Sequence, residues 1–171
     1  MVIVVMGVSG SGKTAVGERV AEVLGIEFLD ADAFHSEENR LKMASGVPLE
    51  DADRAPWLDA LAAAIHERLA SGRSAVLACS ALKQRYRDAL KRSSAQVRFV
   101  YLKGSFALLH ERLANRAGHY MKADMLESQF AALEEPTDAV IIDAATPIGQ
   151  QVAVIISALA DDTAGTLTVP G

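Results

Sequence analysis

The segment GVSGSGKT, which follows a short apolar run near the start of the chain, constrains the fold more than any other part of the sequence. It fits the pattern G-x-x-x-x-G-K-[ST], with Gly7 and Gly12 at the fixed glycine positions and Lys13 and Thr14 at its end. Backbone N–H groups hold a triphosphate in such a loop, and residues without a Cβ let the backbone approach it closely. The segment therefore predicts a phosphate-binding loop.

The surroundings of this loop agree with its chemistry. An apolar strand pattern precedes it and a helical pattern follows it, so the N-terminus of the helix would face the phosphates. We expect Lys13 to reach the β- and γ-phosphate oxygens and the Thr14 hydroxyl to bind Mg²⁺. The nucleotide-binding residues predicted here are Gly7, Val8, Ser9, Gly10, Ser11, Gly12, Lys13 and Thr14. An incidental glycine-rich turn, which is the alternative, would not need this order of strand, loop and helix.

Composition and length narrow the class of protein. The 171 residues are half hydrophobic and 23% charged, as expected for a single globular domain over residues 1–171. The net charge of −5 gives no global positive field for nucleic acid or an anionic membrane surface. Cys79 is the single cysteine and lies in an apolar run, so we expect a buried, inert thiol and no intramolecular disulfide. Without a signal-peptide pattern or a membrane-spanning apolar run, a cytoplasmic location is expected.

Five short apolar runs alternate with longer helical patterns, an order typical of βαβ units. The runs are Val2 to Met6, Glu27 to Asp30, Ala75 to Cys79, Val97 to Leu102 and Ala139 to Ile142. We therefore predict a five-stranded parallel sheet covered by helices on both faces, a three-layer α/β/α fold. The first helix should begin near Lys13 and end at Gly25. Its predicted core residues are Val16, Val20, Val23 and Leu24.

The segment 32–73 is too long for one crossover and contains two helical patterns separated by a turn-rich stretch at 45–48. Asp53 would cap the second helix, and Pro56 would lie in its first turn. Trp57 then opens a helical repeat of apolar residues and would anchor that helix in the core. Because ligands of open parallel sheets collect beyond the carboxyl ends of the strands, we expect this helical sub-lobe to hold the substrate.

The segment after the fourth strand predicts a lid. A helix is expected over 105–116, a polar break follows, and the helical pattern then resumes. Such a break is typical of a hinge, so we assign residues 112–126 to the lid. Pro147 should start the last helix, which would run to about Ala160 and leave residues 161–171 as a loose tail.

Two acidic residues end the second strand. Asp30 and Asp32 would point the same way along an extended segment, at the sheet edge that carries the phosphate loop. One carboxylate can hold Mg²⁺ through its water shell while the other accepts the proton of an attacking hydroxyl. We assign the metal to Asp30 and the hydroxyl to Asp32, with the order left open. The alternative is a solvated turn in which an Asp caps a helix.

Polar and basic side chains follow on the sub-lobe, among them His35, Arg40 and Arg54. Taken alone they are typical of a solvated face. They would form a binding surface for a substrate with several hydroxyls and a carboxylate, which a planar Arg fork can hold. After the third strand, Lys83 and Arg87 lie four residues apart on one predicted helical face and extend this set.

Arg112 and Arg116 are also four residues apart, one turn before the break in the predicted lid. Closure would bring both guanidinium groups onto the transferring phosphoryl group, where arginine stabilises the charge of the transition state. Two solvent-facing arginines beside Glu111 are the alternative. The catalytic residues predicted from the sequence are Lys13, Asp32, Arg112 and Arg116.

With these residues in place, the chain resembles the gluconokinase family, the small P-loop kinases that phosphorylate D-gluconate. The shared stretches are MGVSGSGKT, FLDADAFHSEENRLKMASGVPLEDADRAPWL, CSALKQRYRD, VYLKG and ERLANRAGHYMKADMLESQFAALEEP. The phosphate loop occurs in many activities, whereas the second stretch and the GHYM segment are far more specific. The departures are small, because only Ser36 for a common Pro and Ala31 for a common Gly stand out.

The resemblance implies a fold like that of adenylate and shikimate kinases, with strand order 2-3-1-4-5, a helical substrate insertion and a lid. It implies phosphoryl transfer from ATP, with Mg²⁺, to the C6 hydroxyl of gluconate, which gives 6-phosphogluconate and ADP for carbohydrate metabolism. It places Pro147 in an adenine-side loop and is compatible with a homodimer. The residues that it assigns to gluconate are Asp32, His35, Arg40, Arg54, Lys83, Arg87 and His119.

Two other functions use the same loop. Another small-molecule kinase would act on shikimate, a nucleoside monophosphate or adenylyl sulfate. A nucleotide-dependent switch or ATPase would transfer phosphate only to water and act through protein partners. Against a GTPase, the sequence has no N-K-x-D, and no D-x-x-G directly follows the third strand. The third strand lacks the acidic end of ATP-hydrolysing motors, and Asp143 at the end of the fifth is equally consistent with a capping role.

Overall fold

The computed structural model of the chain describes residues 1–92, 94–115 and 123–164. Five parallel strands form one sheet in the order β2-β3-β1-β4-β5, which confirms the predicted fold class. The strands are β1 (Val2–Met6), β2 (Glu27–Asp30), β3 (Ala75–Ala78), β4 (Val97–Lys103) and β5 (Ala139–Asp143). In the central register, Val4 lies opposite Leu77 of β3 on one side and Phe99 of β4 on the other.

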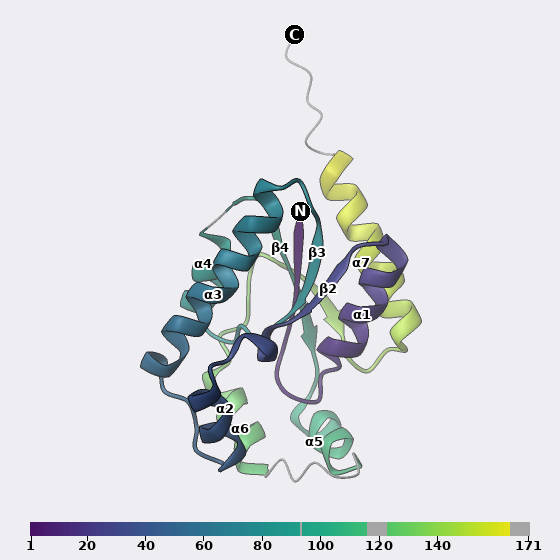
Figure 1. Cartoon of the computed structure of the whole chain (residues 1–171). Helices are drawn as coiled ribbons and strands as arrows, with labels where there is room; N and C mark the ends of the chain where they lie inside the picture. The colour runs from purple at the N-terminus through teal and green to yellow at the C-terminus, as the bar shows by residue number, and fades with distance from the viewer. Residues whose placement is uncertain (93, 116–122, 165–171) are drawn as a thin grey trace.

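Helices cover both faces of this sheet. They are α1 (Lys13–Leu24), the 3₁₀ turn η1 (Ala31–Phe34), α2 (Glu37–Ala44), α3 (Asp51–Ala70), α4 (Gln84–Lys91), α5 (Phe106–Ala114), α6 (Ala123–Ala132) and α7 (Ile148–Ala164). Figure 1 shows α3 and α4 on one face, α1 and α7 on the other, and α2, α5 and α6 gathered beyond the carboxyl ends of the strands. The phosphate loop, between β1 and α1, opens at that same end.

The central strand β1 is buried along its whole length and contributes side chains to two separate hydrophobic cores. Val4 packs in the core that contains α3 residues such as Ile65, and the next residue, Val5, packs in the core that contains Val20 of α1. This alternation follows from the two-residue period of a strand. A strand without exposed residues therefore fixes the position of the loop that follows it.

The core face of α1 differs from the prediction. Val16 and Val20 are buried as expected, but Val23 and Leu24 in the last turn are 53% and 38% exposed. The contact face is centred instead near Gly17, where an added Cβ would lie 2.9 Å from the ring of Phe28. The absence of a side chain at this position lets α1 approach the sheet closely, a signal that apolar periodicity does not carry.

The start of α3 also differs from the prediction. Glu50 is the N-cap, and Asp53 is the third helical residue, whose carboxylate accepts the Glu50 backbone N–H at 2.9 Å in a capping box. Pro56 consequently lies inside the helix, beyond its first turn. Trp57 is only 3% exposed, and its Nε1 donates to the carbonyl of Ala31 at 2.8 Å, which confirms that it anchors the helix.

The end of the chain continues as a helix for longer than expected. α7 begins at Ile148, directly after Pro147, and reaches Ala164. The remainder of the predicted tail, and residues 116–122 of the predicted lid, lie outside the described residues. Within the described part of the chain, no helix combines the length and apolar character needed to cross a membrane.

Candidate functional site

The phosphate loop ends in a helix that has no cap of its own. Gly12 is the N-cap residue of α1 with φ 94°, and as a glycine it makes no side-chain cap bond to the helix. The first turn carries no acidic residue, and a Cβ added at Gly12 would meet nothing within 4 Å. These N–H groups and the helix dipole therefore favour an anion from outside the chain. The loop fits the phosphates of a nucleotide.

Two glycines of the loop are required by the protein itself. A Cβ at Gly7 would lie 2.8 Å from the carbonyl oxygen of Leu102, and one at Gly10 would lie 3.0 Å from that of Leu109. Both residues also have positive φ, 147° and 80°. Packing against β4 and α5, in addition to the approach of a ligand, thus explains why glycine occupies these positions.

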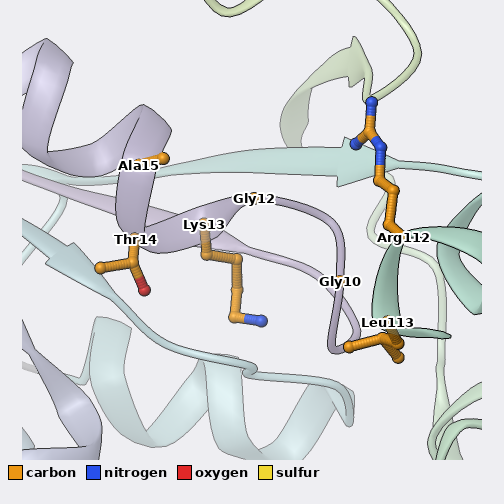
Figure 2. A pocket seen from close by; sticks show the side chains of 7 residues that line it. All are labelled: Gly10, Gly12, Lys13, Thr14, Ala15, Arg112 and Leu113. Atoms are coloured by element: carbon orange, nitrogen blue, oxygen red, sulfur yellow. The ribbon is translucent and has the colours of Figure 1, made fainter. Parts of the chain in front are cut away.

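Two pockets meet at this loop. The first, called the loop pocket, has a volume of about 320 Å³ and is lined by Gly10, Gly12, Lys13, Thr14, Ala15, Arg112 and Leu113 (Figure 2). The second, called the sub-lobe pocket, has a volume of about 440 Å³ and runs from Lys13 and Thr14 to Asp32 and Trp57. Because Lys13 and Thr14 line both, a group bound in one pocket would lie next to a group bound in the other.

The two carboxylates at the end of β2 both line the sub-lobe pocket. Asp30 is half-buried, and its Oδ1 accepts the backbone N–H of Asp32 at 3.0 Å as the cap of η1. Asp32 is exposed. The capping alternative therefore holds for Asp30 without excluding the other role, since a carboxylate has further lone pairs for a metal-bound water. Which of the two serves the metal and which the hydroxyl stays a prediction.

His35 lines the sub-lobe pocket together with residues of the phosphate loop. Its ring stacks on Trp57 with centroids 4.6 Å apart and planes 6° from parallel, and it is 7% exposed. Among the described residues, its Nδ1 is buried without a hydrogen-bond partner. Burial lowers the pKa of His35, nearby Arg54 and Arg40 lower it further, and Asp32 opposes them. The imidazole is thus neutral at pH 7 and able to bond a polar ligand.

The two arginines of the sub-lobe have different positions. Arg54 is half-buried, lines the sub-lobe pocket and donates to the carbonyl of Leu49 at 3.3 Å. Arg40 is exposed and donates to the carbonyl of Ala33 at 2.7 Å, outside the pocket lining. The structure therefore brings His35 and Arg54 to the site but leaves Arg40 beside it.

Lys83 and Arg87 do not reach either pocket. Lys83 is the N-cap residue of α4 and pairs with Asp51 at 3.4 Å. Arg87 is 2% exposed and donates at 3.0 Å to the carbonyls of Ala81 and Leu82. These bonds support the turn after β3, where Ala81 has a positive φ of 43°. Both basic residues are engaged by their own element or its neighbour, so the predicted contact with substrate is not supported for either.

Arg112 lines the loop pocket, but its guanidinium extends away from Lys13 and Thr14 (Figure 2). Its Nη2 donates to the carbonyl of Ala144, in the loop between β5 and α7, at 2.8 Å. Pro147 follows in that loop and lines neither pocket. In the same loop, the Asp143 carboxylate accepts the N–H of Ala145 at 2.8 Å, which supports its capping alternative.

Two predicted site residues, Arg116 and His119, lie outside the described residues. In contrast, Gln129 of α6 was not predicted, although it lines the sub-lobe pocket and contacts the loop. It bonds to Ser9, 120 residues earlier, so no local pattern could have indicated it. Cys79 also lines the pocket, but burial raises its thiol pKa to about 12, consistent with the inert residue expected.

Known proteins similar to this chain agree with the geometry. A family model described as an AAA domain matches residues 2–140. A "Probable gluconokinase" of Rattus norvegicus is 49% identical over 80% of this chain and 83% of that protein. The "Thermoresistant gluconokinase" of Escherichia coli K12 is 44% identical over 92% of this chain and 93% of its own. The crystal structure of a gluconokinase from Sinorhizobium meliloti 1021, 47% identical, superposes with a TM-score of 0.82 and covers 93% of this chain and 91% of that one.

Proposed function

Because the chain belongs to the gluconokinase family, we propose that it transfers the terminal phosphoryl group of ATP to the C6 hydroxyl of D-gluconate. The products are ADP and 6-phosphogluconate. The observation that carries this proposal is the phosphate loop, whose Lys13 and Thr14 line two adjoining pockets at once. Such a site holds donor and acceptor side by side, and positioning accounts for much of the rate of phosphoryl transfer.

On the nucleotide side, the residues of the loop bind and orient the phosphates. The uncapped N-terminus of α1 supplies N–H donors and a partial positive charge, and Lys13 adds a full charge beside them. We assign Mg²⁺ to the Thr14 hydroxyl and, through its water shell, to the Asp30 carboxylate, with Asp32 in the same pocket as the alternative. When bound there, Mg²⁺ would neutralise charge on the phosphate oxygens.

On the acceptor side, each residue has a distinct part. Asp32 accepts the proton of the C6 hydroxyl, the neutral His35 bonds a hydroxyl of gluconate, and Arg54 holds its carboxylate. Arg112 would have to leave the carbonyl of Ala144 before it could reach the transferring phosphoryl group. The roles of Arg116, His119 and Pro147, the cytoplasmic location and a homodimer stay predictions.

The test is ADP release by the purified protein with MgATP and either D-gluconate, shikimate, AMP or no acceptor. We expect turnover with gluconate alone, in the range of about 1 to 100 per second that is usual for kinases. The Lys13→Met variant, purified in parallel, is the blank for contaminating kinases. Equal slow hydrolysis with every acceptor would reject gluconate as the substrate, and turnover with shikimate or AMP would replace it.

A further inference from the structure

Gln129 of α6 holds the tip of the phosphate loop by two hydrogen bonds. Its Oε1 accepts the backbone N–H of Ser9 at 2.7 Å, and its Nε2 donates to the Ser9 hydroxyl at 2.9 Å. Both residues are half-buried and line the sub-lobe pocket. One side chain thus binds the main chain and the side chain of the same loop residue.

These two bonds leave the Ser9 hydroxyl hydrogen free for an acceptor other than Gln129. A backbone N–H can only donate, so the amide oxygen of Gln129 must face it and the amide NH₂ must face the Ser9 side chain. The Ser9 oxygen therefore accepts from Gln129, and its single hydrogen is directed to a different acceptor. The orientation of Gln129 makes Ser9 a hydrogen-bond donor within the pocket.

The position of Ser9 indicates which ligand group would receive that hydrogen. Gly10, Lys13 and Thr14 line both pockets, whereas Ser9 lines the sub-lobe pocket and not the loop pocket. A phosphoryl group that passes from nucleotide to acceptor must cross at the shared residues. Ser9, adjacent to Gly10 on the acceptor side, would thus lie near the terminal phosphoryl group as it crosses.

The helix that carries Gln129 is itself well supported. Leu126, one turn earlier, is 1% exposed and packs with Val8 of the loop and Leu109 of α5. Beyond the helix, the backbone N–H of Glu134 donates to the carbonyl of Leu82 at 2.9 Å. These contacts join α6 to the phosphate loop, to α5 and to the turn after β3, and so hold Gln129 against Ser9.

We propose that Gln129 is a positioning residue that orients the Ser9 hydroxyl to donate to the phosphoryl group during transfer. This inference rests on the proposed kinase function. Charge on the phosphoryl oxygens is spread and increased in the transition state, so a donor held in place contributes more to kcat than to the binding of ATP. Loss of either partner should therefore lower kcat more than it raises the KM for ATP.

The experiment is a double-mutant cycle of Ser9→Ala and Gln129→Met. Ser9→Ala removes the hydroxyl and keeps the backbone N–H, whereas Gln129→Met removes both bonds with a side chain of similar length. A third variant, Gln129→Glu, keeps an acceptor for the N–H but has no N–H to donate, so the Ser9 hydroxyl would turn towards the carboxylate. Gln96→Met is the matched control, because Gln96 is exposed and lies directly before β4, at the end of the strand away from the phosphate loop. Each protein is assayed for kcat with gluconate and for affinity to ADP and to β,γ-imido-ATP.

We expect Ser9→Ala and Gln129→Met each to lower kcat by roughly tenfold, the effect of one hydrogen bond to a charged group. The double variant should be no slower than the slower single variant, since each substitution abolishes the oriented donation from the Ser9 hydroxyl to the phosphoryl group. Gln129→Glu should be as slow as Gln129→Met. Affinity for β,γ-imido-ATP should fall by about threefold while that for ADP stays within about twofold, because only the former has a terminal phosphoryl group.

Several results would overturn the proposal. Independent, multiplicative losses in the double variant would show that Gln129 acts without Ser9, and a wild-type kcat for Gln129→Glu would show that the backbone bond alone matters. Equal weakening of ADP and imido-ATP would assign Gln129 to the shape of the loop. Failure of the function itself gives a different pattern: the wild-type protein would not turn over gluconate, and the two nucleotide affinities would still test the Gln129 contact.

Discussion

The two walls of the sub-lobe pocket are built in different ways. The phosphate wall, residues 8–14, connects the fully buried strand β1 to α1 and is further held by α6 through Gln129. The acceptor wall, formed by α2 and the loop 45–49, has a single buried residue within its helix, Asn39. Its apolar side chains Leu41 and Val47 are 65% and 50% exposed. One wall is fixed by the core of the domain, and the other is fixed by a few polar contacts.

Those contacts join the acceptor wall to α3. The amide Nδ2 of Asn39 donates to the carbonyl of Asp53 at 2.7 Å, and Lys42 pairs with the Asp53 carboxylate at 2.6 Å. The Ser36 hydroxyl caps α2 by accepting the N–H of Asn39 at 3.2 Å. The phosphate wall is therefore held by the buried core of the domain, whereas α2 is held against α3 mainly by these polar contacts.

The strongest test of the phosphate wall is Lys13→Met. Loss of the charge beside the phosphates should lower kcat by at least about 10³-fold, a size typical of single cationic groups in phosphoryl transfer. The melting temperature should change little, because Lys13 is only half-buried and its ammonium bonds to a loop carbonyl, that of Val8. Steady-state kinetics and thermal unfolding measure both quantities. More than about a hundredth of the activity remaining would contradict the role given to Lys13.

Asp32→Asn tests the carboxylate between the two walls. The isosteric amide cannot accept the proton of the attacking hydroxyl, so kcat should fall by about 10²-fold or more while the KM for ATP stays near its original value. Asp59→Asn, which changes an exposed carboxylate of α3, is the matched control. If Asp32→Asn kept a near-normal kcat, Asp30 would become the candidate for the base, and Asp30→Asn would be measured next.

Asn39→Ala should loosen the acceptor wall alone. Removal of its amide breaks the bond to the carbonyl of Asp53, so the KM for gluconate should rise by roughly tenfold. The kcat and the KM for ATP should stay within about twofold, because the phosphate wall does not contact this residue. Ser45→Ala is the control, since within the described part of the chain the Ser45 hydroxyl bonds to the carbonyls of Leu41 and Lys42 of its own helix. A matching loss of kcat would show that the two walls are coupled.

The smallest expected effect is on the pH dependence of stability. Burial lowers the pKa of His35 in the folded protein, so the unfolded chain takes up a proton near pH 6.5 that the folded chain resists. Stability should therefore decrease as the pH falls below about 6.5, with a slope of less than one proton. His35→Phe, which can keep the stack on Trp57, should remove this contribution. His66→Asn, at an exposed position of α3, should leave it; equal slopes for all three proteins would contradict the assignment.

Some parts of the fold and of the site could be predicted from the sequence, and others could not. The phosphate loop and the five parallel strands were predictable because glycine spacing and apolar runs are local signals. The order of the strands came from the family resemblance, and the structure confirms it. The sequence also placed Asp30 and Asp32 at the correct edge of the sheet, since the end of a parallel strand fixes that position. The phosphate loop and the sheet edge that carries the two carboxylates were therefore predicted correctly from local sequence.

The group that each basic or amide side chain contacts was not predictable from the sequence. Arg87 has the spacing of a ligand-binding residue, but it folds back onto the carbonyls of the turn before its helix. Arg112 bonds to Ala144, 32 residues away, and Gln129 bonds to Ser9, 120 residues away. A basic or amide side chain has the same appearance in a sequence whether it meets a substrate or a carbonyl. Only the three-dimensional arrangement distinguishes the two cases.

The uncapped start of α1 has a thermodynamic consequence for the protein as a whole. A helix whose first N–H groups bond to a bound anion is more stable with that anion than without it, so nucleotide and folding are linked equilibria. At a nucleotide concentration of 100 times Kd, the folded state gains about 2.7 kcal/mol, and the unfolded population falls by about a hundredfold. The supply of ATP would then set how long each molecule survives proteolysis, as well as how fast it works.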